Sequence, residues 1–183
     1  MGGVTELVGP RSSGRTAVAY AVAAAVTATG ALAACVDLPD ALDAGHAQAA
    51  GIRLANVLWV RPPDERVALR VAEQILGAGG FRLVLIDLGE APSPRVAGMP
   101  AVWMRLGRAA VRSGAIVVTV GGRRSAGACA ALSLEISRRQ VSFSGEGGPC
   151  PLFEGIDGRI RLRRSRALAG LAADARLFAA TAA

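Results

Sequence analysis

The sequence predicts an α/β fold in which helices cover both faces of a mainly parallel central sheet. One observation is that short apolar strands without alternation are separated by helical segments, as in a sheet buried on both sides. A second is a glycine-rich loop, residues 9–16, between the first strand and the first helix. A third is the alternation of apolar and polar residues over 131–137 and 159–163, which predicts two half-exposed strands that extend the sheet as an antiparallel pair.

These patterns place the elements in order along one domain, residues 1–183. Five apolar runs predict the buried strands, at residues 4–8, 31–37, 56–60, 81–87 and 115–120. Helical spacing and helix-starting residues predict the helices between them, at residues 16–28, 41–51, 63–78 and 100–113. Residues 144–158 are rich in Gly and Pro and predict a loop, and residues 166–183 predict a helical C-terminal tail.

Charge is distributed unevenly along the chain. All 21 basic residues are arginine, and the net charge is +7. Residues 1–100 hold 8 arginines and 9 acids, a net charge of −1, whereas residues 101–183 hold 13 arginines and 5 acids, a net charge of +8. The second half therefore suggests an anionic partner, either nucleic acid or an acidic protein surface, against the alternative of a simple solvated surface.

Eight arginines are the candidate contacts to such a partner. Three recur at helical spacing, two follow the fifth strand, and three share one face of a strand; they are Arg105, Arg108, Arg112, Arg123, Arg124, Arg159, Arg161 and Arg163. Their guanidinium groups suit DNA phosphates or the carboxylates of a protein partner. Solvated helix and strand faces are the alternative reading of the same pattern.

The remaining compositional features bound the class of protein. Three cysteines without a CxxC pair indicate a reducing cytoplasm, where nucleoid association is also possible, and Cys35 and Cys129 are expected to be buried in apolar runs. The uncharged run 16–36 is long enough to suggest a membrane helix, but Ala and Thr predominate in it and Gly30 divides it, so we expect no membrane segment. No metal site is expected.

The loop GPRSSGRT matches the phosphate-loop pattern G-x-x-x-x-G-K-[ST] except that Arg15 replaces the lysine. In that pattern, backbone N–H groups and a helix N-terminus form an anion cradle, and Thr16 would hold magnesium. Arginine is longer and planar and does not replace the lysine. We expect Arg15 to pair with a strand-end acid, Asp37 or Asp87, and to block the phosphate position. The candidate nucleotide-binding residues are Gly9, Ser12, Ser13, Gly14, Arg15, Thr16, Asp37 and Asp87.

The order of these motifs resembles the ATP-binding core of the bacterial RecA recombinases. The resemblance rests on GPRSSGRT, on VDLPDALDAGHAQAAGI (36–52), on NVLWVRPPDERVALRVAEQIL (56–76) and on RLVLID (82–87), whose Asp87 would be the Walker B acid. It covers residues 3–125 with good spacing and extends loosely to residue 166. The resemblance implies a three-layer RecA-like fold.

The departures from that family fall on its chemistry. The resemblance implies a glutamate general base where this chain has Pro39, with Asp40 out of register. It implies an Asn-Gln phosphate sensor where the chain has Gly121 and Gly122, and a long DNA-binding loop that is missing after Arg124. The N-terminal segment that joins RecA subunits does not appear in this sequence. Either the sequence is part of a longer chain or the protein forms no RecA-type filament, and we expect the latter.

Three functions remain open at this point. The resemblance is nearest to the ImuA family, RecA-like accessory proteins of SOS-induced mutagenic translesion DNA synthesis. It implies a chain that is no enzyme, has no required cofactor, and contacts RecA, ImuB and an error-prone C-family DNA polymerase. The first alternative is a SulA-type cell-division inhibitor. The second is a divergent ATP-dependent recombinase paralogue that binds ATP and magnesium.

Overall fold

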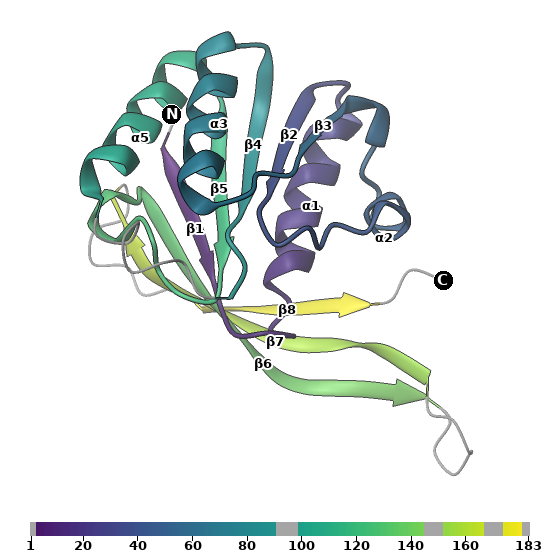
Figure 1. The fold of residues 1–183 in the computed structure, drawn as a ribbon. Coiled ribbons are helices and arrows are strands. Elements are labelled where there is room, and N and C mark those ends of the chain that lie inside the picture. Colours follow the sequence, from purple (N-terminus) through teal and green to yellow (C-terminus); the bar gives the residue numbers. More distant parts are fainter. Residues whose placement is uncertain (1–2, 91–98, 145–151, 167–173, 181–183) are drawn as a thin grey trace.

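The computed structural model describes residues 3–90, 99–144, 152–166 and 174–180, and its described strands form one mixed sheet in the order β3-β2-β4-β5-β1-β6-β7-β8 (Figure 1). The six strands from β3 to β6 are parallel to their neighbours, whereas β7 runs antiparallel to β6 and β8 runs antiparallel to β7. This confirms the mainly parallel sheet and its antiparallel extension. The strands are β1 (Val4–Val8), β2 (Leu32–Asp37), β3 (Val57–Val60), β4 (Phe81–Asp87), β5 (Ile116–Gly121), β6 (Leu132–Ser144), β7 (Leu152–Ser165) and β8 (Asp174–Ala180).

The helices begin where the sequence supplies a start signal. Asp43 and Asp64 accept hydrogen bonds from the backbone N–H groups of His46 (2.6 Å) and Val67 (2.8 Å) and so cap two of them. The helices and 3₁₀ turns are α1 (Arg15–Ala28), α2 (Ala44–Ala49), η1 (Leu54–Asn56), α3 (Glu65–Ala78), α5 (Pro100–Ser113) and η2 (Gly127–Cys129).

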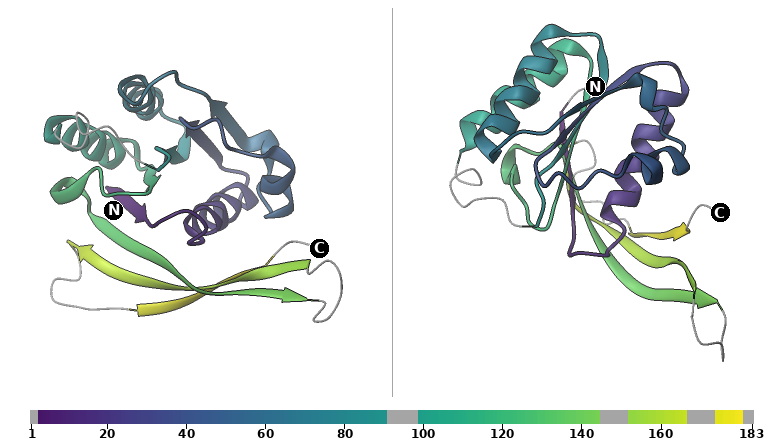
Figure 2. Two further views of the ribbon diagram at one scale, coloured as in Figure 1. Left: turned by 60° about the horizontal axis from the view of Figure 1, so that its bottom comes forward. Right: turned by 45° about the vertical axis from the view of Figure 1, so that its right-hand side comes forward.

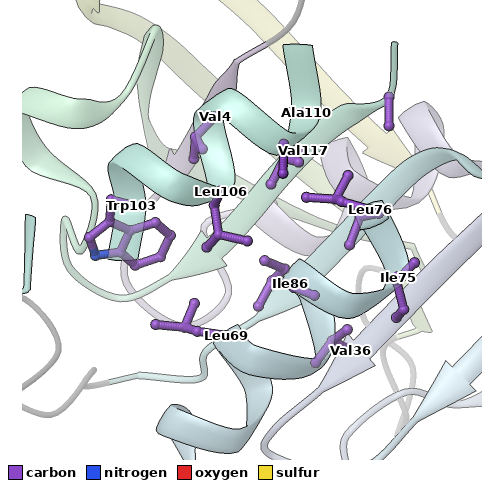
Figure 3. Packing of buried hydrophobic residues seen from close by; sticks show 14 of the residues in the cluster. Val4, Val36, Leu69, Ile75, Leu76, Ile86, Trp103, Leu106, Ala110 and Val117 are labelled. Carbon is purple, nitrogen blue, oxygen red and sulfur yellow. The ribbon is translucent and has the colours of Figure 1, made fainter. Parts of the chain in front are cut away.

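Two apolar layers form the core, one on each face of the sheet. Helices α3 and α5 cover one face, where Trp103, Leu106 and Ala110 of α5 pack toward Ile86 and Val117 of the sheet, as the helical spacing predicts (Figure 3). Helix α1 covers the other face with Ala19, Tyr20 and Ala23. The two faces are thus each covered by helices (Figure 2). In a sheet of this kind a site is expected at the carboxyl ends of the parallel strands.

Strands β6 and β7 form a long twisted arm that extends beyond the helical layers (Figure 1). Near its tip the rings of Phe143 and Phe153 meet edge to face, with centroids 5.9 Å apart. The predicted pair 131–137 and 159–163 is confirmed, but both strands are longer than predicted, and residues 152–158 are strand rather than loop. Glycines at 155 and 158 lie in β7, each paired with β6 beside a shift in register.

The predicted helical tail is wrong where the structure describes it. Residues 174–180 form β8, which pairs with the outer edge of β7. Segment 174–180 contains Ala and Leu, which favour a helix, but the free edge of β7 offers backbone partners that local propensity does not reveal. The remainder of the predicted tail, apart from Arg166, lies outside the described residues, as does Cys150.

None of the helices described by the structure combines the length and apolar character that crossing a membrane requires.

Candidate functional site at the glycine loop

The glycine loop lies at the carboxyl end of β1 and leads directly into α1. A side chain at Gly9 would place its Cβ atom 2.3 Å from the carbonyl oxygen of Ile136, so only glycine fits there. Gly14, the N-cap of α1, has a φ of 90°, and Ser12 has a φ of 56°; both are in the left-handed region. The backbone thus takes the sharp turn that the spacing of the motif predicts, and Thr16 lies in the first turn of the helix.

Arg15 turns its side chain back into this loop. It is 8% exposed, and its guanidinium donates hydrogen bonds to the carbonyl oxygen of Gly9 and to the carboxylate of Glu90, with which it forms an ion pair. Arg11 also approaches Glu90, at 3.5 Å. The expected pairing of Arg15 with Asp37 or Asp87 is therefore wrong. Both aspartates accept backbone hydrogen bonds near their own strand ends, whereas Glu90 lies in a loop beside Arg15.

Glu90 is held in place by the backbone of the neighbouring loop. The N–H of Gly122 donates to the carbonyl oxygen of Gly89 at 2.9 Å, and a Cβ atom at residue 122 would lie 2.1 Å from the carbonyl oxygen of Glu90. No side chain fits at residue 122 without moving the loop after β4. The position where the resemblance implies a sensor side chain is thus occupied by backbone.

Asp37 is buried at the end of β2, where three hydrogen bonds hold it. Its carboxylate accepts the N–H of Ala41 at 3.1 Å, the N–H of Leu42 at 2.9 Å, and the indole N–H of Trp59 at 3.2 Å. Asp37 therefore organises the turn that follows β2 and joins it to the edge strand β3. Asp40 in that turn has a φ of 51° and lies 3.7 Å from Arg61, in an exposed ion pair away from the glycine loop.

Asp87 ends β4 in register with Asp37, and its carboxylate accepts the N–H of Gly89 at 2.8 Å. Burial raises the pKa of Asp87 above its ordinary value of 3.8; the Gly89 hydrogen bond and Arg15 act to lower that pKa, and Asp37 and Glu90 act to raise it. The structure thus brings Asp37 and Asp87 to one edge of the sheet, as parallel strand ends require.

A small cavity of about 80 Å³ lies between these aspartates and α1. Thr16, Tyr20 and Cys35 line it together with both acids. Burial, followed by the neighbouring acidic groups, raises the pKa of Tyr20 and of Cys35 to about 12 in each case. The cavity has room for a few water molecules but not for a nucleoside. Among the described residues, no group of three or more His, Cys, Asp or Glu side chains is arranged to hold a metal ion.

The candidate arginines do not form one surface. Arg105 pairs with Glu73 of α3 at 3.0 Å, whereas Arg108 and Arg112 line a separate cavity. Arg163 donates to Glu135 of β6 at 2.6 Å. Arg159, Arg161 and Arg163 alternate along β7 with Ile160, which packs on the core, so they share the opposite face as predicted. Arg123 and Arg124 are both exposed after β5, and Arg124 approaches Glu6 at 3.7 Å.

Two residues of the site were not predicted from the sequence. Glu90 lies in no recognisable motif, and only its position three residues after a strand-end acid marks it. Glu6 is buried in β1, where its Oε1 atom accepts the N–H groups of Ser125 (2.8 Å), Ala126 (2.6 Å) and Gly127 (3.3 Å). An acid inside an otherwise apolar strand was the signal that could have identified it. Cys129, expected to be buried, is half-buried beside α5.

A strand, a glycine loop and a helix, with two acids at the neighbouring strand ends, define the chain as a member of the phosphate-loop class of α/β proteins with a RecA-like core. The chain belongs to the RecA N-terminal domain family, whose sequence model matches residues 1–135.

Individual relatives match a shorter part of the chain. It is 35% identical to protein RecA of Desulfotalea psychrophila over 94 residues and 38% identical to protein RecA of Borrelia duttonii over 95 residues. Each match covers 51% of this chain and 26% of the relative. The identity to protein RecA of Lactococcus lactis is 37% over 94 residues, 51% of this chain and 24% of that protein. The match thus spans about a quarter of the length of these relatives.

Proposed function

We propose that this chain is a non-catalytic RecA-like accessory protein that acts by contact with other proteins. The observation that carries the proposal is the position of Arg15, whose buried guanidinium binds the Gly9 carbonyl oxygen and the Glu90 carboxylate. A nucleotide phosphate that entered the loop would have to displace an arginine from an ion pair and bring a second anion close to Glu90. Both changes oppose nucleotide binding.

Two neighbouring features support the same proposal. The contact of Gly122 with the Glu90 backbone leaves no space for a side chain that senses a phosphate group. Asp37 is occupied by hydrogen bonds to Ala41, Leu42 and Trp59, and Pro39, which carries no titratable group, stands where the family resemblance implies a general base. Four positions therefore argue against ATP hydrolysis: Arg15, Asp37, Pro39 and Gly122. Replacing Arg15 by lysine alone would not produce hydrolysis.

The biological setting follows from the family resemblance. Membership of the RecA N-terminal domain family supports a role in DNA repair. Within it, the resemblance to ImuA proteins leads us to propose SOS-induced mutagenic translesion synthesis, in the cytoplasm, with RecA, ImuB and an error-prone C-family DNA polymerase as partners. The net charge of +8 in residues 101–183 is consistent with contact to acidic protein surfaces or to DNA.

Calorimetry with ATP and magnesium tests the catalytic part of this proposal. We expect no saturable heat and no phosphate release from the wild-type chain. In the Arg15→Lys variant, binding should stay weak and phosphate release should stay absent, since the Gly122 and Pro39 positions are unchanged. A wild-type chain that binds ATP tightly and releases phosphate steadily would overturn the proposal and favour the divergent recombinase.

Co-purification tests the partners. The tagged chain is mixed separately with RecA, with ImuB, with the C-family polymerase and with the tubulin-like division protein. Retention of any of the first three supports the accessory role. Retention of the division protein alone would contradict it and favour the SulA-type inhibitor.

A further inference from the structure

A second cavity, separate from the glycine loop, opens beside α5. It has a volume of about 380 Å³ and lies where α5 meets the start of β6. Its apolar lining includes Trp103, which is 1% exposed, and Met104 and Val111, which are 48% and 60% exposed. This volume is in the range of ligand-binding cavities and is large enough for one bulky apolar side chain. Exposed apolar residues beside a cavity mark a binding surface more often than isolated ones do.

Positive charge surrounds this apolar lining. Arg108 and Arg112 lie one turn apart on α5, and Arg166 follows β7; no acidic residue lines the cavity among the residues that the structure describes. Arg166 donates to the carbonyl oxygens of Ala128 (3.3 Å) and Cys129 (3.1 Å), which hold its guanidinium near the cavity. The cavity therefore offers three cations around a hydrophobic pocket.

Two of these arginines differ from other arginines of the chain in having no acidic partner among the described residues. Arg105 on the same helix is paired with Glu73, and Arg163 on β7 is paired with Glu135. In contrast, Arg108 and Arg112 are exposed and form no hydrogen bond or ion pair with any other described residue. Two guanidinium groups one helical turn apart, without a partner among the described residues, match carboxylates one turn apart on a facing helix.

We propose that this cavity, with Arg108, Arg112 and Arg166, binds an acidic amphipathic segment of a partner protein. A large apolar side chain of the partner enters between Met104 and Val111, and flanking Asp or Glu carboxylates pair with the arginines. The apolar lining favours a protein segment over nucleic acid, because a phosphate backbone has no apolar group to bury there. This inference rests on the proposed function in one respect, namely that the chain acts by binding other proteins.

Selection from a displayed library of random peptides tests the inference on the whole chain. Peptides are selected on the wild-type protein, and their enrichment is compared with the enrichment obtained on the double variant Arg108→Glu/Arg112→Glu. The matched control is Arg138→Glu/Arg139→Glu, which reverses two exposed arginines on β6 whose side chains form no hydrogen bond or ion pair with the described residues. Both pairs are exposed, and thermal unfolding of each variant checks that the fold is intact.

The inference predicts enrichment of peptides that combine Asp or Glu with Leu, Ile, Met or Phe. Their affinity, measured by fluorescence polarisation, should fall at least about tenfold in the Arg108/Arg112 variant and stay unchanged in the Arg138/Arg139 variant. Enrichment of peptides without acidic residues, equal loss in both variants, or no enrichment over the Arg108/Arg112 variant would overturn it.

A fluorescent single-stranded DNA oligonucleotide is the competing probe. Loss of DNA binding on Arg108→Glu/Arg112→Glu, without peptide selection, would assign the cavity to nucleic acid and also overturn the inference. These results are independent of ATP binding, so failure here and failure of the proposed function are distinguishable.

Discussion

Arg15 of the glycine loop is ion-paired with Glu90, which follows β4 on the neighbouring side of the loop. The side chain of Arg15 is 9% exposed and that of Glu90 is 40% exposed, so the pair lies at the border of the solvent. A cation that would otherwise attract phosphate is in this way satisfied within the chain. The first prediction tests how much the fold depends on that pairing.

Glu90→Ala should lower the free energy of unfolding by about 1–3 kcal/mol. Among the described residues, the change leaves the buried Arg15 guanidinium with the Gly9 carbonyl oxygen as its one partner. Arg11→Ala is the control: Arg11 is 85% exposed and 3.5 Å from Glu90, so its loss should cost less than about 0.5 kcal/mol. Urea unfolding measures both, and equal effects would show that the Arg15 pair does not stabilise the fold.

Gly122→Ala should be strongly destabilising, by more than about 2 kcal/mol, because the added methyl group collides with the backbone of Glu90. Gly77→Ala in α3 is the matched control. Its Cβ atom would meet no atom within 4 Å, and the exchange should stabilise the helix by about 0.5–1 kcal/mol. Thermal and urea unfolding give both values, and a neutral Gly122→Ala would show that the loop after β4 moves freely.

Glu6→Ala should cost more than about 3 kcal/mol, since three backbone N–H groups of the turn after β5 would lose their shared acceptor. Glu6→Gln retains a side-chain oxygen for these groups and should cost less. If the two variants unfold at the same urea concentration, the hydrogen bonds to the turn are not the source of stability.

Asp87→Asn should change how stability depends on pH. The folded chain holds the proton of Asp87 more tightly than the unfolded chain does, because burial raises the pKa of this carboxyl above 3.8. The wild-type chain therefore loses stability as pH rises from 3.8 through the folded pKa, and the asparagine variant lacks this loss.

The variant should consequently gain stability relative to wild type as pH increases, until Asp87 is fully ionised. Urea unfolding at a series of pH values measures this difference. A difference that stays constant with pH, or that shrinks as pH rises, would contradict the assigned direction of the pKa.

Local signals were sufficient for most of the parallel core. The strand at 4–8 and the helix at 100–113 have the predicted bounds, because an apolar run and an amphipathic stripe between clear breakers specify them. Strand β8 was missed because it depends on the open edge of β7, which is a tertiary feature. The length of the β6–β7 arm was underestimated for a similar reason.

The site was predictable only in part. The glycine loop and the two strand-end acids were placed correctly, since motif spacing and parallel topology determine them. The partner of Arg15 was not, because Glu90 reaches the loop through backbone contacts between residues 89 and 122 that no sequence pattern reveals. The sequence also did not reveal that the arginines of α5 have different surroundings. Arg105 forms an ion pair with Glu73 of α3, whereas Arg108 lines a cavity.

The contact between Gly122 and Glu90 also limits how this lineage can change. A mutation that introduces a polar side chain at residue 122 meets an occupied space, and one that moves the loop after β4 separates Glu90 from Arg15. Each step is costly without the other, so a loop with room for a side chain at residue 122 requires coordinated substitutions at positions distant in the chain.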